Sequence, residues 1–378
     1  MARARHETGS ARGSSLRLRA LCVLLLAAPI AWVAPLLGLA VSGNPIAPYL
    51  AFPPKTLPAT HAPASWLWFG LLSLPAIVAL GLIVLAVARA RPQTRVVHAR
   101  RPFPLWGWVG LAALAAGWFA AWSEHTPAEW RRHAFTPLWV GYVLAVNALL
   151  HRRTGRSLFT ARPLWFATLF PASAAFWWLF EYLNQFVRNW HYVGIPASGD
   201  WDYLLQGTLP FSTVLPAIAS TWMWLRQFPR LEAPRLPTVR ARPAAAWLAV
   251  AAGVLGLVAI GPWPEASFPM LWVGPLLLVC GLQQLLTGTN LLAPLAHGDW
   301  RPVVQPALAA LACGLLWEFW NYGSLAKWQY SIPHVQRLHV FEMPLLGYAG
   351  YLPFGVTCAL VMDALARLVE RRPLYLAP

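Results

Sequence analysis

Long apolar stretches alternate with short polar segments along the whole chain, and this pattern predicts helices that cross a membrane. Each stretch reaches the length of about 17 to 25 residues that a helix needs to span a hydrocarbon core. The stretches are residues 16–40, 65–88, 104–122, 134–150, 164–187, 209–225, 243–261, 268–287, 303–325 and 349–366. We therefore expect an all-α, polytopic integral membrane protein with about ten transmembrane helices.

The first stretch has one alternative interpretation, a cleaved signal peptide, because an Arg-rich segment precedes it. It is longer than the apolar core of a signal peptide, which is about 7 to 15 residues, and no strong A-x-A cleavage site follows it. We interpret it as the first span. The Pro-rich segment that follows, residues 43–64, is expected to be a loop.

The composition strengthens the membrane interpretation. Hydrophobic residues make up 58% of the 378 residues and charged residues 11%, whereas soluble domains carry about 25% charged residues. The 23 Trp and 35 Pro fit the same class, because Trp anchors helices at the membrane interface and membrane helices tolerate Pro. The composition therefore argues against a large soluble protein.

The formal net charge of +16 is distributed in a way that orients the chain. Most of the Lys and Arg, 23 of 29, lie in the N-terminal segment, in residues 89–101, 151–163, 226–243 and 288–302, and in the C-terminal tail. These are alternate loops, and cytoplasmic loops carry such an excess of basic residues. We expect a multi-pass protein of the cell membrane, an inner membrane, with both termini cytoplasmic. The lipid bilayer is its expected partner, and nucleic acid is not.

A segment of the first half recurs in the second half. Residues 179–196 read LFEYLNQFVRNWHYVGIP and residues 316–333 read LWEFWNYGSLAKWQYSIP, which share the pattern E-[YF]-x-N, then W-x-Y, then Pro. The similarity extends to PLWVGYVLAVNALLHRRTGRSLF from Pro137 and MLWVGPLLLVCGLQQLLTGTNLL from Met270. It predicts two tandem four-helix repeats. An even number of spans gives both repeats the same orientation, so a rotation about the membrane normal should relate them.

The spans, the repeats and the basic segments together define the expected organisation of the chain. A two-helix extension with a Pro-rich outer loop precedes two parallel four-helix repeats, and a basic linker joins the repeats. The segments are a cytoplasmic N-terminal tail 1–15, the extension 16–102, repeat 1 at 103–226, the linker 227–242, repeat 2 at 243–367 and a cytoplasmic tail 368–378.

The candidate catalytic residues are Glu181 and Glu318, the acids of the repeated segment. Counted along their helices, they lie about 26 Å and 22 Å from the cytoplasmic side, close to the outer face of a core of about 30 Å. An acid inside a membrane usually faces the bundle interior and has a partner. Asn184 and Asn321, one turn on, are the nearest candidate partners.

The two acids have two possible uses. If they meet near the axis between the repeats, they form one outer-facing paired-carboxylate site in which acid and base roles can be divided. The alternative is that each acid hydrogen-bonds across helices inside its own repeat and stabilises the fold. Both uses fit a duplicated residue.

The outer loops 188–208 and 326–348 are long, without evident secondary structure, and they differ between the repeats, so they are candidates for a binding loop. The residues expected to bind a substrate are Asn184, Asn321, Trp190, Tyr192, Trp328, Tyr330, His191, His339 and Glu342. The spacing of five between His334 and His339 does not match a helical zinc pair, and we expect no metal and no cofactor. Asp363 has Arg367 one turn on, which predicts an ion pair near the cytoplasmic face.

These features favour a membrane protein that binds a lipid-like or isoprenoid substrate at the paired Glu/Asn site. The sequence leaves open whether binding is followed by acid/base chemistry, as in a membrane-embedded enzyme. A proton- or cation-coupled transporter is the second hypothesis; it is less favoured because transport sites lie near the midplane. A non-catalytic membrane scaffold is the third.

Overall fold

The computed structural model of the chain describes residues 2–91, 101–196, 199–240 and 242–374. Most of these residues are helical, and seven helices of the described part are long and apolar enough to cross a membrane. These are Ser15–Val41, Trp66–Ala88, Leu105–Trp122, Pro163–Val187, Met270–Thr287, Arg301–Gly323 and Leu345–Glu370. The expectation of a helical, multi-pass membrane protein is confirmed.

The elements follow one another along the chain as mostly long helices, with short strands after α7 and after α13. They are α1 (Ala2–Val41), η1 (Ala47–Tyr49), α2 (Trp66–Ala88), α3 (Leu105–Trp122), α4 (Ala128–His133), α5 (Phe135–Thr154), α6 (Leu158–Ala161), α7 (Pro163–Val187), β1 (Trp190–Val193), α8 (Asp200–Phe211), α9 (Val214–Leu225), α10 (Pro243–Ala259), α11 (Pro264–Ser267), α12 (Met270–Thr287), η2 (Ala293–His297), α13 (Arg301–Gly323), β2 (Lys327–Tyr330), β3 (His339–Val340), β4 (Met343–Pro344), η3 (Leu345–Gly350) and α14 (Tyr351–Glu370).

Four predicted segments differ from the observed elements or cannot be fully compared with them. Helix α1 begins at Ala2, so its backbone includes residues 2–15 of the segment that the sequence predicted as a polar tail. The central part of the basic segment 89–101 and the end of the tail 368–378 lie outside the described residues. Helix α5 occupies the weakest predicted span, but it is not among the seven membrane-spanning candidates.

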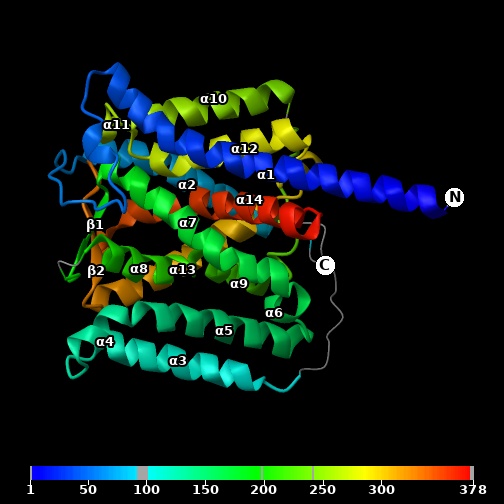
Figure 1. Cartoon of the computed structure of the whole chain (residues 1–378), viewed down its shortest axis with the longest axis horizontal. Coiled ribbons are helices and arrows are strands. Elements are labelled where there is room, and N and C mark those ends of the chain that lie inside the picture. The colour runs from blue at the N-terminus through cyan, green and yellow to red at the C-terminus, as the bar shows by residue number, and fades with distance from the viewer. Residues whose placement is uncertain (1, 92–100, 197–198, 241, 375–378) are drawn as a thin grey trace.

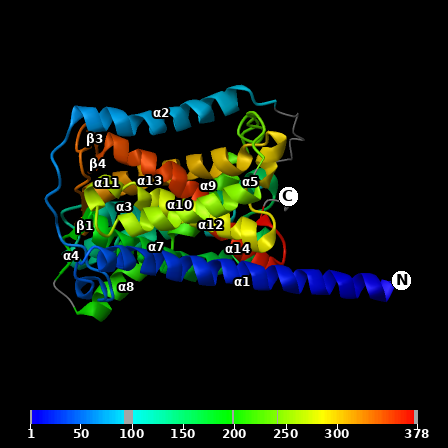
Figure 2. The same ribbon diagram turned by 90° about the horizontal axis from the view of Figure 1, so that it is seen from above.

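Helices α7, α9, α13 and α14 pack together in the centre of the bundle. The pair α3 and α5 lies on one side of them, and the pair α10 and α12 lies on the other (Figure 1). Helix α1 runs along α10, α12 and α14, whereas α2 lies along the opposite edge of the bundle and is little buried (Figure 2). The strands β1 and β2 lie at the end of the bundle opposite to the start of α1 and the end of α14; we call it the strand end.

The two flanking helix pairs are closely packed at glycines that occupy matching positions. A Cβ added to Gly141 of α5 would lie 2.7 Å from the carbonyl oxygen of Gly110 on α3. A Cβ added to Gly253 of α10 would lie 2.9 Å from the carbonyl oxygen of Gly274 on α12. Small residues let membrane helices approach this closely, so glycines at the contact allow the close packing of both helix pairs.

The turns that follow α5 and α12 are also built alike. Gly155 and Gly288 end the two helices in the left-handed conformation, with φ of 76° and 74°, which suits glycine at a helix C-terminus. The backbone N–H of Leu158 then donates to the side chain of Asn147 at 3.0 Å. In the second half, Leu291 donates to Gln283 at 3.2 Å.

The apolar stretch 209–225 is not one helix, as the sequence predicted, but two. Helix α8 ends at Phe211 and α9 begins at Val214. The hydroxyl of Ser173, on α7, donates to the carbonyl oxygen of Phe211 at 2.5 Å and accepts from the N–H of Leu215 at 3.0 Å. These bonds satisfy backbone groups that the break leaves without helical partners, so a residue from another helix stabilises the interruption.

The two loops that the sequence analysis expected to be outer, 188–208 and 326–348, contain strands that it missed, and we keep the name outer loops for them. Strand β1 comes from the first loop and β2 from the second, and they pair antiparallel; β3 and β4 form a second small antiparallel pair. The Trp-x-Tyr alternation suits a strand, in which alternate side chains share a face. A lone four-residue strand has no partner within its own segment, which is why the pattern did not predict it.

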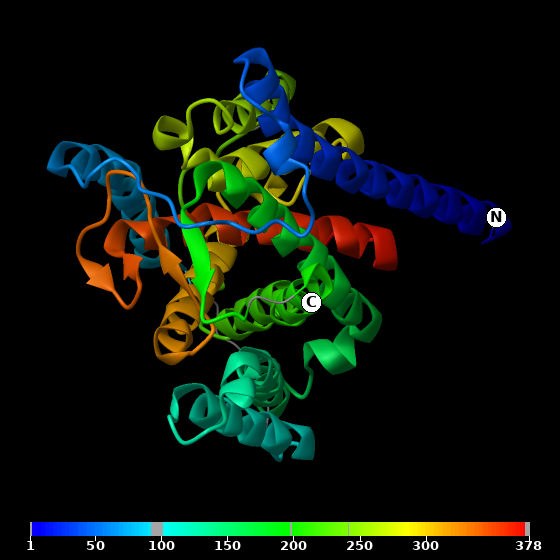
Figure 3. The same ribbon diagram turned by 60° about the vertical axis from the view of Figure 1, so that its left-hand side comes forward.

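The Pro-rich segment between α1 and α2 crosses the strand end of the bundle and passes over β1 and β2 (Figure 3). It is held there by hydrogen bonds to both outer loops. Thr56 accepts from Asn184 at 3.1 Å, the carbonyl oxygen of Ala59 accepts from Ser331 at 2.8 Å, and His61 contacts the carbonyl oxygen of Arg188 at 3.2 Å. The segment therefore covers the strands, and we call residues 43–64 the strap.

Candidate functional site

The repeated Trp-x-Tyr segments meet in the β1–β2 pair. Trp190 lies opposite Tyr330, and Tyr192 lies opposite Trp328. Each Trp is thus paired with the Tyr of the other copy, as a local two-fold rotation requires. The strand pair brings the two candidate acids, each on the helix that precedes its strand, to the same end of the bundle.

Glu181, on α7, is buried and accepts hydrogen bonds from aromatic side chains. Tyr192 donates its hydroxyl at 2.6 Å and Trp177 its indole N–H at 2.9 Å, both to Oε1. The indole N–H of Trp190 lies 3.1 Å from Oε1 and 3.3 Å from Oε2. An indole nitrogen can only donate, so these groups are arranged to solvate a carboxylate.

Glu318, on α13, is buried in a related but less complete shell. Oε1 accepts from the hydroxyls of Tyr330 at 2.7 Å and Tyr351 at 2.9 Å. The indole of Trp328 donates to the Tyr330 hydroxyl at 2.9 Å and thereby aligns it. Oε2 is buried and has no hydrogen-bond partner among the described residues. The Glu–Tyr bond is therefore common to both copies, and the rest of the shell differs.

One exchange of residues explains that difference. Gly314 stands where the first copy has Trp177, and a Cβ at Gly314 would lie 2.4 Å from the ring of Tyr351. The second copy thus lacks the indole donor one turn before its acid, and the phenol of Tyr351 from α14 fills the space and supplies the donor. Each acid therefore receives one aromatic donor from a helix: Trp177 of α7 for Glu181 and Tyr351 of α14 for Glu318.

The sequence analysis expected Asn184 and Asn321 to be the partners of the acids. In the described residues, their side chains instead bond to the backbone of the strands. The side chain of Asn184 donates to the carbonyl oxygen of Trp190 at 2.7 Å and accepts from its N–H at 3.3 Å. Asn321 makes the same two bonds with the backbone of Trp328, at 2.8 Å and 2.9 Å. Each amide therefore fixes the start of a strand relative to its helix and positions the Trp that follows.

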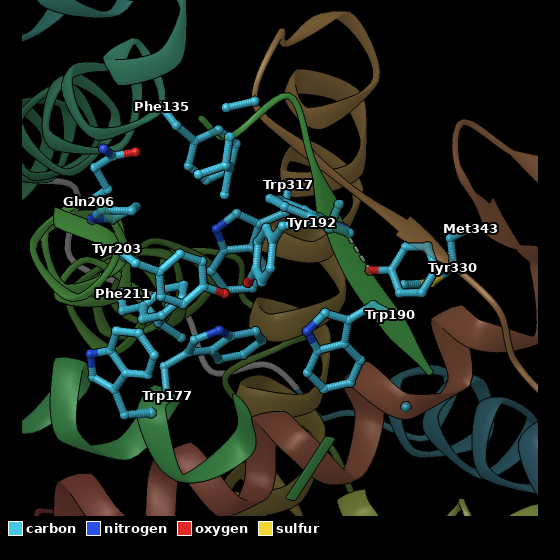
Figure 4. A pocket seen from close by; sticks show the side chains of 18 of the residues that line it. Phe135, Trp177, Trp190, Tyr192, Tyr203, Gln206, Phe211, Trp317, Tyr330 and Met343 are labelled. Atoms are coloured by element: carbon cyan, nitrogen blue, oxygen red, sulfur yellow. Dashed lines mark hydrogen bonds between the residues drawn. The ribbon is translucent and has the colours of Figure 1, made fainter. Parts of the chain in front are cut away.

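A partly open cavity with a volume of about 140 Å³ lies between the two shells. Its wall combines the aromatic donors of both acids with apolar residues from α5, α8 and the second outer loop (Figure 4). The donors that reach it are Trp177, Trp190 and Tyr192 on the Glu181 side and Trp328, Tyr330 and Tyr351 on the Glu318 side. The carboxylates themselves stand behind this wall, so the groups that face the cavity are phenols and indoles.

The remaining cavity wall is mainly aromatic and aliphatic. It includes Phe135, Trp178, Ile195, Tyr203, Gln206, Phe211, Val214, Trp272, Trp317 and Met343. Burial raises the pKa of Tyr192 and Tyr330 well above that of free tyrosine, and the neighbouring acids raise it further. Both hydroxyls thus keep their protons and remain donors at physiological pH.

Charged side chains near the cavity are paired with each other and not with the two acids. Arg132 of α4, which contributes to the wall, binds Glu129 at 2.5 Å, and Lys327 binds Glu342 at 2.5 Å. Within the described part of the chain, neither Glu181 nor Glu318 forms an ion pair within 4.0 Å. The two carboxylates have neutral donors only.

Five residues of the expected binding set do not contribute to the cavity wall: Asn184 and Asn321, which hold the strand backbones, and His191, His339 and Glu342. His191, on β1, is partly buried, which lowers its pKa. His339, on β3, is exposed and contacts Gln336 at 3.2 Å, and Glu342 is engaged by Lys327. Among the described residues, no group of three or more His, Cys, Asp or Glu is placed to hold a metal ion.

Several wall residues escaped the sequence analysis. Trp177 and Trp317 belong to the aromatic residues around the repeated acids, where an interfacial belt was the simpler interpretation. Tyr351 precedes Leu-Pro-Phe, as Thr208 does in the first half, and comparing these two positions would have shown that a hydroxyl occurs at both. Nothing in the local sequence marks Trp272, which reaches the cavity from α12.

The fold and the cavity define a helical, multi-pass membrane protein with two buried acids behind one aromatic cavity. A scan against protein-family models, a search of curated proteins and a search of solved structures each find no match to this chain.

Proposed function

We propose that the cavity between Glu181 and Glu318 binds a lipid-like or isoprenoid ligand. One observation carries this proposal: a single cavity is walled by the hydrogen-bond donors of both acids. Ligand sites are typically apolar and aromatic pockets with a few polar groups that fix orientation. Here the polar groups are the phenols of Tyr192, Tyr330 and Tyr351.

We further propose the arrangement that gives such a ligand access. Ten spans would make up a two-helix extension and two parallel four-helix repeats, with both termini cytoplasmic and the strand end outside. The matching glycines, turns and Glu–Tyr bonds of the two halves support the repeats, and the alternating Arg-rich loops support the orientation. The ligand would then enter from the outer leaflet or the outer aqueous side.

The geometry also supports a route for proton transfer. Each carboxylate is separated from the cavity by a tyrosine hydroxyl that donates to it at 2.6 or 2.7 Å. If a ligand group releases a proton to the phenol oxygen, the phenol proton can pass to the carboxylate, and the reverse transfer restores both. In this proposal Tyr192 and Tyr330 touch the ligand, while Glu181 and Glu318 act through them.

Substitution of the acids tests the proposal, because Glu→Gln keeps the size of the side chain and removes the titrating group. We expect Glu181→Gln and Glu318→Gln to insert and purify like the parent protein but to fail to restore the lipid profile of a deletion strain. Loss of a proton-transfer group typically lowers a rate by about 10² to 10⁴. Glu124→Gln is the matched control, since Glu124 is exposed and outside the cavity.

Two outcomes would contradict the proposal. Full complementation by both variants would show that the acids only stabilise helix packing. A ligand-independent proton or cation flux in liposomes, lost in both variants, would favour the transporter hypothesis instead. The tyrosine variants Tyr192→Phe and Tyr330→Phe should resemble the Glu→Gln variants, because each removes one step of the same relay.

A further inference from the structure

We infer that the ligand carries a positively charged organic nitrogen, an ammonium group, which is held among the aromatic rings between the two acids. This inference rests on the proposed function, because it names the polar end of the ligand that the cavity would bind. It uses the ring geometry, the electrostatic balance of the cavity wall and the incomplete shell of Glu318.

Aromatic rings from several elements gather in the wall, and we call this group of rings the cage. Trp190 lies between Trp177 and Trp272, with ring centroids 6.3 Å and 5.8 Å away, and Trp317 stacks with Tyr351 at 6.0 Å. These rings come from α7, β1, α12, α13 and α14, so both halves of the chain contribute. Trp and Tyr rings attract cations through their π-systems, and quaternary ammonium groups are bound by groups of such rings.

The charges around the cage favour a cation. Glu181 and Glu318 are buried without an ion pair in the described residues. Burying a carboxylate without an opposite charge is costly, and neutral donors offset only part of that cost. For Glu181 the offset is large, since indole and phenol donors converge on it. For Glu318, Oε2 accepts no hydrogen bond from the residues that the structure describes.

A cation in the cage would complete this balance without touching the carboxylates. The indole and phenol groups that line the cavity donate their hydrogens to the acids, so each acid makes the π-systems of its donors more attractive to a cation. The basic side chain in the wall, Arg132, is already paired with Glu129. An anionic head group would instead meet two buried carboxylates.

The rest of the wall suits an apolar chain attached to that nitrogen. Apolar side chains of Ile195, Pro210, Val214 and Met343 extend the cavity away from the cage. Helix α8, which forms part of this wall, carries exposed Trp201, Leu205 and Leu209 on its other face. An alkylammonium amphiphile or a lipid with a trimethylammonium head group has this combination of a cationic end and an apolar chain, and free choline has the head group alone.

The test compares ligands that differ in charge and not in shape. Choline and its uncharged carbon isostere, 3,3-dimethyl-1-butanol, are titrated into the purified full-length protein in lipid nanodiscs, with tryptophan fluorescence as the signal. We expect choline to bind at least about tenfold more tightly, the value of a single favourable cation–ring contact. Decyltrimethylammonium should bind more tightly than choline, and decyl phosphate should not compete with it.

Substitutions place the effect in the cage. Glu318→Gln and Trp190→Phe should reduce the preference for choline over the isostere, whereas Glu124→Gln should keep it. Because the comparison of the isosteres is made first in the parent protein, a variant that fails to fold does not leave the inference untested. Binding of choline without added gain from the decyl chain would support the inference with a free ammonium compound as the ligand.

The failures of the two proposals are distinguishable. Equal binding of decyltrimethylammonium and decyl phosphate, with no preference for choline over its isostere, would overturn the inference and leave lipid-like binding intact. No binding of any decyl compound or of choline would overturn both. Preferential binding of decyl phosphate would also overturn the inference, because it would show that the buried acids do not set the electrostatic potential of the cavity.

Discussion

His191 of β1 lies directly opposite Gln329 of β2 and forms the centre of the strand pair. On either side of this pair, the Trp of one copy faces the Tyr of the other. The local two-fold relation between the halves therefore passes through two positions whose residues differ. The outer positions, which reach the acids and the cavity, keep the same residues, so the symmetric part of the strand pair is the part that forms the site.

The exchange of Trp177 for Gly314 predicts the effect of a small substitution. Gly314→Ala should displace the ring of Tyr351, since the added Cβ would lie 2.4 Å from it, and overpacking of this kind costs about 1 to 3 kcal/mol. Thermal unfolding in nanodiscs should show a lower midpoint. Gly81→Ala on α2 is the control, because nothing lies within 4 Å of its added Cβ. Equal midpoints for both variants would contradict the packing of Tyr351 against Gly314.

The backbone clamps made by the Asn side chains predict a graded response. Asn184→Asp keeps the acceptor for the N–H of Trp190 but loses the donor to its carbonyl oxygen, whereas Asn184→Ala loses both bonds. Each unsatisfied buried group costs about 1 to 3 kcal/mol, so we expect Ala to lower the unfolding midpoint more than Asp. The substitutions at Asn321 should follow the same order. Stability unaffected by either Ala variant would show that the clamps are not needed to hold the strands.

The buried ion pair at the other end of the bundle is a third test. Asp363 and Arg367 are both buried and lie 2.7 Å apart on α14, as their spacing predicted, and Gln283 and the N–H of Leu374 also donate to Asp363. Asp363→Ala leaves the guanidinium without its counter-charge, which costs about 3 to 5 kcal/mol. The double variant Asp363→Leu with Arg367→Met should recover much of this loss. A double variant less stable than Asp363→Ala would contradict the explanation.

The proposed orientation gives a prediction that is independent of the ligand. Reporter fusions after residues 156 and 235, in Arg-rich loops, should be active on the cytoplasmic side. Fusions after residues 55 and 335, in the strap and the second outer loop, should be active on the opposite side. An external signal at residue 235 would contradict the ten-span arrangement, because that residue lies in the linker between the proposed repeats.

Much of this architecture could be predicted because it follows from local patterns. Length and hydropathy located the apolar helices, and the repeated segment located Glu181 and Glu318 and the aromatic residues beside them. The break between α8 and α9 could not be predicted, since the hydroxyl that stabilises it belongs to Ser173 on another helix. The strand pair was missed for the same reason: its hydrogen bonds join segments from different halves of the chain.

The partners of the two acids in the candidate site also depend on contacts that local sequence patterns do not show. Sequence spacing placed an Asn one turn after each acid and made it the obvious partner, but the backbone turns back and brings the strand closer to that amide. The partners of the acids are instead Tyr and Trp side chains, and Tyr351 reaches Glu318 from 33 positions along the chain. Which donor fills the space near an acid depends on packing between helices, and Gly314 shows that a missing side chain can decide it.

Photolabelling tests the central claim, that one cavity bounded by both halves binds an amphiphile, most directly. A decyltrimethylammonium probe with a diazirine in its chain is irradiated with the protein in nanodiscs, and adducts are mapped by mass spectrometry. We predict adducts both near Tyr192 and in the segment from Met343 to Tyr351, competed by unlabelled probe and reduced by Ala326→Trp, which fills the cavity wall. Adducts confined to the lipid-facing helix α2, and unchanged in Ala326→Trp, would contradict the claim.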